Sequence, residues 1–368
     1  MKRLLYLYPE EWTGQRAREL HTLQTCRALA NAGLDVTLVV AGGLDLEAAL
    51  AGLGEGKAPN SLHVATVSRR FGPIKSAGIF GRRFRQWLSR QPDFDAAFAI
   101  HLKAAGMLAP LEIPYWWEAH EIFAETPDPG SKRAHHLERM EGEALREAEG
   151  IVVTSRALGE ALQARYFAAH EELPYVVVPH GGSEPAASPL LDPQGPLVYA
   201  GSLAGWKGLP LVLEAAAEQG LPLRVIAGDE PEWSQWKQRL TPATAGAIDW
   251  RPRVPAGELR GLLSGCRAGL CPTVVASGSG RYSLPMKLFD YAGAGLPALA
   301  SALPALKGLG TEAWCRQVEP PTREAWRRAL DRLDPAPEEG GAALDWAKDH
   351  TWAQRGRRLR EVIFSDGL

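Results

Sequence analysis

The sequence predicts an α/β protein made of two doubly wound domains, each built around a largely parallel sheet. Its 368 residues exceed what one hydrophobic core usually serves. Short apolar runs alternate with helical patterns from end to end, which is typical of β-α-β units. This alternation lapses between residues 179 and 196, a stretch with five prolines. The sequence therefore predicts one domain over residues 1–182, a linker over 183–196, a second domain over 197–348 and a terminal amphipathic helix over 349–368.

The elements of the two domains follow from the period of their apolar residues. In the first domain, apolar runs predict strands at residues 4–8, 36–41, 62–67, 96–100, 113–117 and 151–154. A helix after the first strand has its apolar positions at Leu20, Leu23, Cys26 and Ala30. In the second domain, strands are predicted at residues 197–201, 223–228, 269–272 and 297–301. The helix after the first of these has a buried stripe of Leu209, Val212, Leu213 and Ala216.

Composition limits the class of protein. Apolar residues make up 45% and charged residues 23% of the chain, the balance of a folded protein, and the net charge of −2 gives no overall attraction to nucleic acid. The four cysteines are too irregularly spaced for a disulfide framework or a zinc motif, so we expect buried thiols and no metal or other cofactor. No stretch approaches the roughly 20 apolar residues of a spanning helix. We expect a cytoplasmic protein, at most peripheral on the inner face of the membrane.

Ligands of doubly wound sheets bind beyond the carboxyl ends of the strands, so the loops after strands are the places to look for a site. The loop after residues 197–201 runs from Gly201 and Ser202 to Lys207, directly before a helix. Glycine allows close approach of the backbone, the helix start offers unpaired N–H groups, and the lysine adds positive charge. This pattern suits a diphosphate, but it equally suits an ordinary loop with a solvated lysine.

A second candidate segment runs from Ser277 to Asp290. It begins with glycines and serines around Arg281 and continues, from Pro285, into a helix that is apolar on nearly all sides. Only Lys287 and Asp290 interrupt the apolar surface, and their i, i+3 spacing points both charges in a similar direction. Buried charges are costly unless they are paired, so these two either bridge each other or face a polar ligand. The adjacent polar loop favours the ligand.

The two segments together resemble the donor-binding motifs of the retaining GT-B glycosyltransferases of family 4. The matching residues are Gly201-Ser202-Leu203 with Lys207-Gly208, and then Pro285-x-Lys287-x-x-Asp290-Tyr291-Ala292-x-x-Gly295-x-Pro297. In the first half, the loop at Gly14, the segment Ala119-His120-Glu121 and the segment Val178-Pro179-His180-Gly181 are similar to further family features. The resemblance covers nearly the whole chain, and the order and spacing of the motifs carry it.

This resemblance implies a GT-B fold, in which two Rossmann-like domains face a central cleft with the first on the acceptor side and the terminal helix crosses back to it. It implies retaining, metal-independent transfer of a sugar from a nucleotide-diphosphate sugar to a hydroxyl acceptor in glycan, glycolipid or envelope polysaccharide synthesis. The implied donor-binding residues are Gly14, Gly201, Ser202, Lys207, Arg281, Tyr282, Ser283, Leu284, Lys287 and Asp290. Asp290 would bind the ribose and Lys207 the diphosphate; the implied catalytic residues are His120, Lys207 and Arg281.

The sequence also departs from the family pattern. The family usually has glutamate at the places of Asp290 and Tyr282, and often arginine at the place of Ser202. Two alternatives therefore stay open: a nucleotide-sugar epimerase or hydrolase on the same fold, and a non-catalytic nucleotide-binding protein. The motif Asp93-Phe94-Asp95 resembles a metal-binding D-x-D, but it precedes a strand and so lies at the wrong end of the sheet.

Two further features of the first half could bear on the acceptor. His120 follows a predicted strand, where it can bond a sugar hydroxyl or take up a proton, although closing the strand is an equal interpretation. Residues 69–90 contain seven basic residues and no acidic one, interleaved with aromatic and aliphatic side chains. We expect this segment to contact an anionic membrane or lipid phosphate through Arg69, Arg70, Lys75, Arg82, Arg83 and Arg85. A solvated basic helix is the alternative.

Overall fold

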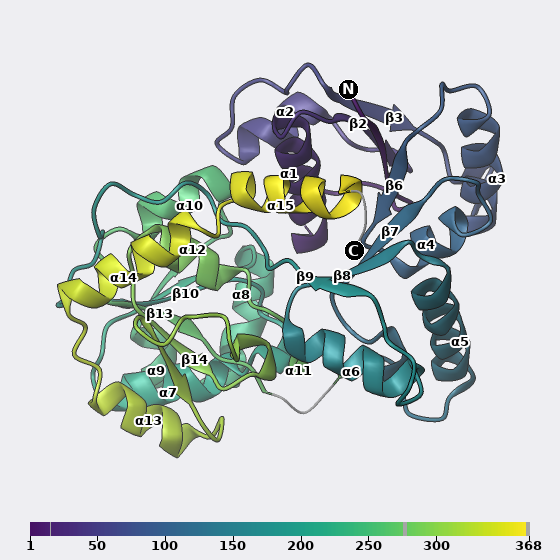
Figure 1. Cartoon of the computed structure of the whole chain (residues 1–368). Coiled ribbons are helices and arrows are strands. Elements are labelled where there is room, and N and C mark those ends of the chain that lie inside the picture. The colour runs from purple at the N-terminus through teal and green to yellow at the C-terminus, as the bar shows by residue number, and fades with distance from the viewer. Residues whose placement is uncertain (15, 275–277, 366–368) are drawn as a thin grey trace. The chain divides into compact units, whose positions relative to one another are not determined.

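The computed structural model of the protein describes residues 1–14, 16–274 and 278–365. The chain forms two compact units: Met1–His180 together with the segment from Trp352 onward, and Gly181–Thr351. Each unit contains one parallel sheet flanked by helices (Figure 1). No helix in the described ranges is both long and apolar enough to cross a membrane.

The first unit is a seven-stranded sheet with the strand order β3-β2-β1-β6-β7-β8-β9. Its strands are β1 (Arg3–Tyr8), β2 (Asp35–Val40), β3 (Leu62–Thr66), β6 (Ala96–Ala99), β7 (Tyr115–Ala119), β8 (Gly150–Val153) and β9 (Tyr175–Val177), and a separate hairpin joins β4 (Arg70–Phe71) to β5 (Ile74–Lys75). Its helices are α1 (Ala17–Asn31), α2 (Leu46–Gly52), α3 (Ala77–Leu88), α4 (Leu102–Leu108), η1 (Phe123–Glu125), α5 (Lys132–Glu147), α6 (Arg156–Tyr166) and α15 (Trp352–Phe364).

The second unit repeats this plan in six strands with the order β12-β11-β10-β13-β14-β15. The strands are β10 (Leu197–Ala200), β11 (Leu223–Ile226), β12 (Ile248–Arg251), β13 (Ala268–Cys271), β14 (Ala298–Ser301) and β15 (Cys315–Val318). The helices are η2 (Gly205–Lys207), α7 (Leu209–Glu218), α8 (Glu230–Trp236), η3 (Lys237–Arg239), α9 (Pro242–Gly246), α10 (Ala256–Leu263), α11 (Gly278–Arg281), α12 (Lys287–Gly293), η4 (Pro304–Leu306), α13 (Arg323–Asp331) and α14 (Pro337–Lys348).

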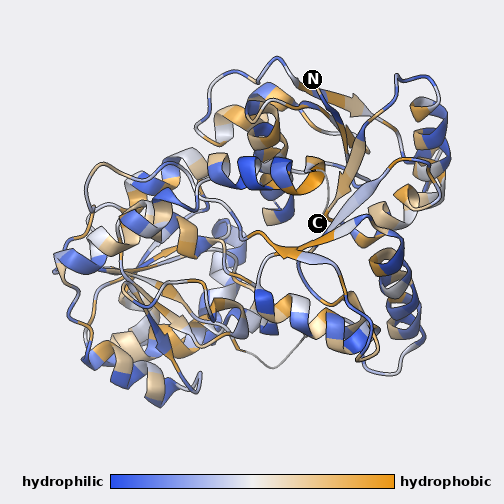
Figure 2. Cartoon of the chain, in the orientation of Figure 1, coloured by the Kyte–Doolittle hydropathy of each residue, from blue (hydrophilic) through white to orange (hydrophobic). Residues whose placement is uncertain are grey.

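Hydrophobic periodicity explains why these segments fold as they do. The predicted stripe of α7 is buried, because Leu209, Val212, Leu213 and Ala216 are each at most 1% exposed. The central strands are buried on both faces, as expected of a sheet covered by helices. Figure 2 shows how the hydropathy of helices differs with their packing: α5, which packs along one face only, is mostly hydrophilic (blue), whereas the last turn of α15 is hydrophobic (orange).

Helix α15 belongs to the first unit, although it is the last element of the chain. It packs on α1, and its Leu359 and Ile363 lie in the same buried cluster as Leu23. The two helix backbones approach closely at Gly356, where a Cβ atom would lie 2.5 Å from the carbonyl oxygen of Ala28. Glycine at this position is therefore required for the packing.

Several boundaries differ from those that the sequence suggests: the first unit ends at His180 and not at residue 182, and the terminal helix begins at Trp352 and not at residue 349. Residues 183–196 belong to the second unit, where the backbone N–H groups of Ala186 and Leu190 donate to the carbonyls of Gly293 and Ala294. Leu190 also packs on the buried cluster around α12. In addition, α12 begins at Lys287 and not at Pro285.

Candidate functional site

The centre of the second sheet, between β10 and β13, is the point where the strand order reverses. These strands pair at Leu197 with Ala268 and at Val198 with Gly269. The hydroxyl of Tyr291 on α12 joins them further along: it accepts a hydrogen bond from Ala200 N (3.0 Å) and lies 3.2 Å from the Leu270 carbonyl, to which it donates. Gly269 leaves room for the Tyr291 ring, which the Cβ of any other residue would overlap. Helix α12 is thereby anchored at the reversal point, where ligands of such sheets bind.

This anchor places Lys287 at the carboxyl end of β10. Its Nζ lies 3.5 Å from the centroid of the Tyr199 ring, and the missing side chain of Gly201 makes the space, since a Cβ there would lie 2.9 Å from Nζ. Within the part of the chain that the structure describes, Nζ is buried without a hydrogen-bond acceptor, and so it is not bonded to Asp290. Burial lowers the pKa of Lys287 to about 7, and the charge of Lys207 adds to this effect.

Lys207 lies in the 3₁₀ turn η2, on the loop that follows β10. Its Nζ is 3.5 Å from the centroid of the Trp206 ring, and burial lowers its pKa to about 8. The loop is held in place because the Trp206 carbonyl accepts a hydrogen bond from Val274 N (2.8 Å), after β13. Two lysines thus lie close enough to influence each other's charge, each on an aromatic ring, with no carboxylate bonded to either among the described residues. Such a pair can hold an anion, whose charge would offset the cost of their burial.

Asp290, one turn along α12, faces a small pocket of the second unit. The pocket also contains Ser183 and Arg260, and its apolar walls include Leu259 and Phe289. Burial raises the pKa of Asp290 to about 7, against the opposing effect of Lys287 and Arg260. A carboxyl group beside an arginine in a small pocket can bond neighbouring hydroxyl groups, as the predicted ribose contact requires.

The other predicted donor residues lie on the same loops or in the first unit. Ser202 follows β10, and its carbonyl accepts a hydrogen bond from the Tyr199 hydroxyl (2.6 Å). Arg281 is exposed, with its guanidinium 5.4 Å from the ring centroid of Tyr282, which is buried. Ser283 is half-buried and Leu284 is buried. Gly14 lies after β1 in the first unit with φ +73°. Ser277, where we expected the segment to begin, lies outside the described residues.

In the first unit, Glu118 near the end of β7 forms a fully buried ion pair with Arg355 of α15. Arg355 Nη2 donates to Glu118 Oε2 (2.6 Å), and Nη1 donates to the carbonyls of Val178 (2.8 Å) and Pro179 (2.5 Å). Burial raises the pKa of Glu118, but Arg355 and the nearby His120 outweigh it and lower this pKa to about 2. The pair ties the end of the chain to the sheet.

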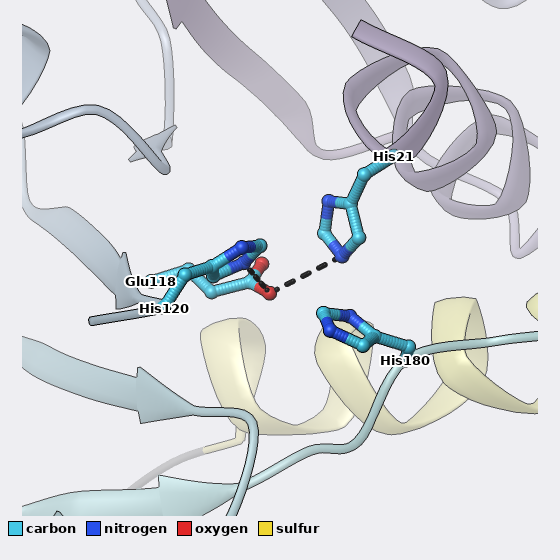
Figure 3. Close-up of side chains that lie close together, drawn as sticks. All are labelled: His21, Glu118, His120 and His180. Carbon is cyan, nitrogen blue, oxygen red and sulfur yellow. Dashed lines mark hydrogen bonds and ion pairs between the residues drawn. The ribbon is translucent and has the colours of Figure 1, made fainter. Parts of the chain in front are cut away.

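His120, which the sequence singles out, is part of a cluster with His21, Glu118 and His180 (Figure 3). Its Nε2 lies 2.7 Å from Glu118 Oε1. This ring nitrogen is therefore already engaged in the protein. The contact between His120 and a transferred sugar, which the resemblance implies, stays a prediction. Of these four residues, the sequence analysis gave a site role to His120 alone and named His180 only within a motif. The cluster joins residues that are up to 159 positions apart (180 − 21), so no local pattern could reveal it.

The reversal point of the first sheet carries a pair that sequence analysis missed. Glu10 follows β1, His101 follows β6, and His101 Nε2 lies 3.1 Å from Glu10 Oε1. His101 also caps α4, since its Nδ1 accepts a hydrogen bond from Lys103 N (3.2 Å). The hydrogen bond to His101 lowers the pKa of Glu10 to about 2, although burial opposes it. Both residues lie directly after strands, and this position was the same signal that identified the loops of the second unit as candidate sites.

The basic segment contains a hairpin as well as a helix. At the β4–β5 hairpin, Phe71 and Ile74 are exposed by 68% and 59%. Arg70 and Lys75 both form ion pairs with Glu11 (3.1 and 2.5 Å). The remaining cations have other surroundings: Arg82 and Arg85 are exposed on α3, Arg69 is half-buried, and Arg83 is half-buried and donates to the carbonyl of Arg70 (2.8 Å). Basic and apolar side chains therefore lie next to each other at the hairpin, and contact of the segment with an anionic surface stays a prediction.

Comparisons with known proteins agree with this architecture. Residues 19–181 match a family model described as a glycosyl transferase 4-like domain. The chain is similar to Alr3699/HepE of Anabaena, solved in complex with UDP and glucose, with a TM-score of 0.72 and 14% identity over 99% of this chain and 100% of that one. It is also similar to WaaG, a glycosyltransferase involved in lipopolysaccharide biosynthesis (TM-score 0.70, 14% identity, 98% and 100% covered). A glycosyltransferase from Rickettsia africae ESF-5 gives a TM-score of 0.69 at 12% identity, with 100% and 99% covered. No curated protein sequence matches.

Two conclusions follow from the fold and from these similarities. The protein has the GT-B fold of glycosyltransferases, in which each unit is a Rossmann-like doubly wound sheet. Residues 19–181 match the model of a glycosyl transferase 4-like domain. This match agrees with the resemblance to family 4 that the sequence motifs indicate.

Proposed function

We propose that the protein is a glycosyltransferase that moves a sugar from a nucleotide-diphosphate sugar to a hydroxyl acceptor, with retention of configuration and without a metal ion in the transfer step. The observation that carries this proposal is the pair of half-buried lysines, Lys207 and Lys287, at the reversal point of the second sheet, with the Nζ atom of Lys287 fully buried. The glycosyl transferase 4-like domain and the UDP bound to the similar HepE support it. Retention and metal independence rest on the resemblance to family 4.

The proposed chemistry is positioning and electrostatic stabilisation. As the bond to the sugar breaks, negative charge grows on the leaving diphosphate, and the two ammonium groups would stabilise it. Both are held in place by aromatic rings, so little reorganisation is needed during the reaction. Arg281, exposed on the neighbouring segment, would add a third positive charge, and Asp290 would orient the donor through its ribose.

The test is the affinity for a nucleoside diphosphate measured by calorimetry in Lys207→Ala. Loss of one charge-assisted hydrogen bond is expected to weaken binding about 10- to 150-fold. The matched control is Lys237→Ala, an exposed lysine of the same unit, which should bind like the wild type. Unchanged affinity in Lys207→Ala would mean that the phosphates bind elsewhere.

A comparison of nucleotide sugars can identify the base and the sugar of the donor. UDP-, GDP-, ADP- and dTDP-sugars can be compared by thermal shift, because a ligand that binds only the folded state raises the melting temperature. The preferred donor is then incubated with and without acceptors. Transfer to a carbohydrate or lipid-linked acceptor is the expected result. Isomerisation or hydrolysis without acceptor would indicate an epimerase or hydrolase, and binding without turnover a non-catalytic protein, the alternative that Ser202 and Tyr282 motivate.

We further propose that the β4–β5 hairpin and α3 rest on an anionic membrane surface, which would bring the enzyme to a lipid-linked acceptor. Phe71 and Ile74 would enter the interface, while Arg82 and Arg85 would lie near the headgroups. Flotation with vesicles containing phosphatidylglycerol should show binding that weakens with salt and that is lost in Phe71→Ser/Ile74→Ser. Equal binding to neutral vesicles would remove the electrostatic part of the proposal.

A further inference from the structure

The cluster around Glu118 contains four potential metal ligands inside the first unit. His21 comes from α1, Glu118 and His120 from the end of β7 and the residues just beyond it, and His180 from the segment after β9. Figure 3 shows the three rings and the carboxylate converging on one point. One ligand atom from each residue can be chosen so that all four lie within 4.8 Å of one another. Segments distant in the sequence thus deliver four donor atoms to one place.

His21 is the least expected member of this cluster. It is 1% exposed, and neither of its ring nitrogens has a hydrogen-bond partner among the residues that the structure describes. Glu118 Oε1 lies 3.4 Å from Nε2, beyond a good hydrogen bond, and the ring of Trp352 packs against the His21 ring edge-on. Buried polar atoms are normally satisfied, and leaving one unsatisfied costs about 1–3 kcal/mol. A metal ion at the centre of the cluster would give Nε2 the partner it lacks.

The spacing of the rings fits a metal centre. Three imidazoles that bind one ion tetrahedrally through bonds of about 2.0–2.1 Å have ring centroids about 5.2 Å apart. In the structure, the centroids of His21 and His120 are 4.7 Å apart, those of His21 and His180 5.1 Å, and those of His120 and His180 5.3 Å. The rings are also steeply inclined to one another, between 67° and 83°. Only shifts of about 1 Å are needed to bring the four donor atoms to bonding distance.

Glu118 is suited to be the fourth ligand because Arg355 occupies only one of its oxygens. Arg355 bonds Oε2, whereas Oε1 faces the histidines. A carboxylate held from behind in this way is typical of metal ligands, whose outer partners fix their orientation. Three imidazoles and a carboxylate form a donor set that zinc prefers.

We propose that His21, Glu118, His120 and His180 bind one divalent metal ion of the zinc class as a structural centre of the first unit. Protein ligands fill all four positions, so the ion would keep no open position for a substrate and would take no part in sugar transfer. Its effect would be to fasten α1, the end of β7 and the segment after β9 to one another. His120 would then use Nε2 as a ligand, and not for a sugar hydroxyl.

The test uses the full-length protein without a histidine tag, stripped of metal with a chelator and titrated with Co²⁺, a spectroscopic substitute for Zn²⁺. We expect one equivalent to give intense visible bands of a four-coordinate site, Zn²⁺ to abolish them by competition, and Zn²⁺ to raise the melting temperature of the stripped protein. The variant His21→Ala should bind at least about 10-fold more weakly. The control His170→Ala, an exposed histidine of the same unit, should bind like the wild type.

Two results would overturn the proposal. One is that the wild type binds no stoichiometric Co²⁺ or Zn²⁺, which would leave the cluster as a hydrogen-bonded network around the Glu118–Arg355 ion pair. The other is equal metal affinity in His21→Ala and the wild type, which would place the metal elsewhere. Neither result depends on whether the protein transfers a sugar, because both are read from metal binding. If His21→Ala does not fold, the wild-type titration still decides.

Discussion

Both units bury charged side chains at the carboxyl ends of their sheets, but they balance those charges differently. In the first unit, Glu118 is paired with Arg355 at 2.6 Å, and both are at most 2% exposed. In the second unit, Lys207 and Lys287 lie near each other without a bonded carboxylate among the described residues, and their pKa values are lowered to about 8 and about 7.

This difference separates a structural arrangement from a binding arrangement. A buried ion pair in which each charge has its partner without any ligand contributes to holding the fold. Removing one partner leaves the other charge buried and unpaired. A buried charge that is incomplete in the empty protein costs stability, and such sites are retained where a ligand completes them. The two sites should therefore respond to mutation with opposite signs, which can be tested.

The largest effect is expected for Arg355→Met. This change leaves Glu118 buried without its ion pair and frees the carbonyls of Val178 and Pro179, so the free energy of unfolding should fall by about 3–5 kcal/mol. Urea denaturation measures it. Arg358→Met, an exposed arginine on the same helix, is the control and should change stability by less than about 0.5 kcal/mol. A similar effect in both variants would show that the ion pair is not what holds α15.

The opposite sign is expected for Lys287→Met. Removing a buried charge that has no partner should stabilise the empty protein, on the order of 1–3 kcal/mol, while weakening nucleoside diphosphate binding at least about 10-fold. Thermal unfolding and calorimetry measure the two effects. Lys237→Met should change neither. If Lys287→Met destabilises the protein instead, the lysine is part of the fold and the contrast between the two units disappears.

The lysines should also make binding depend on pH. Their lowered pKa values mean that the empty protein loses these protons as pH rises through about 7 to 8, whereas the unfolded chain keeps them to about 10.4. Affinity for a nucleoside diphosphate should therefore fall several-fold between about pH 7.5 and pH 9, and binding should take up protons.

Over the same window the unfolded chain binds more protons than the folded one, so the lysines' contribution to the free energy of unfolding rises with pH.

Calorimetry in buffers of different ionisation enthalpy measures the proton uptake that accompanies nucleotide binding. The neighbouring groups are Cys271 and Asp290, and the pKa of Asp290 is about 7, so above about pH 8 this carboxyl is already ionised and the change belongs to the lysines. Binding without proton uptake at pH 8 would contradict the lowered lysine pKa values.

The smallest effect is expected for Gly201→Ala. The new Cβ would lie 2.9 Å from Lys287 Nζ, and the backbone there has φ +153°, so the lysine must shift and affinity should fall a few-fold. Gly246→Ala, where a Cβ meets no atom within 4 Å, is the control. Nucleotide affinity equal to that of the wild type would show that the position of Nζ is not critical.

Much of the fold could be predicted because it rests on local periodicity. The α7 stripe and the buried strands were visible as repeats of three or four and as short apolar runs. Five strands were missed: β4 and β5 of the short hairpin, and β9, β12 and β15. The last two lie at the edges of the second sheet, and their sequences, Ile-Asp-Trp-Arg and Cys-Arg-Gln-Val, are half polar because an edge is only partly covered.

The sequence by itself determined which charged side chains lie on a buried helix of the second unit, because Lys287 and Asp290 interrupt a helix that is otherwise apolar. Only the tertiary structure decided what those charges meet. It placed Lys287 over Tyr199, anchored α12 through Tyr291, and brought Arg355 to Glu118 across 237 positions. The physical reason is that periodicity records burial against a neighbour, whereas the identity of the neighbour depends on strand order and crossover, which no local pattern contains.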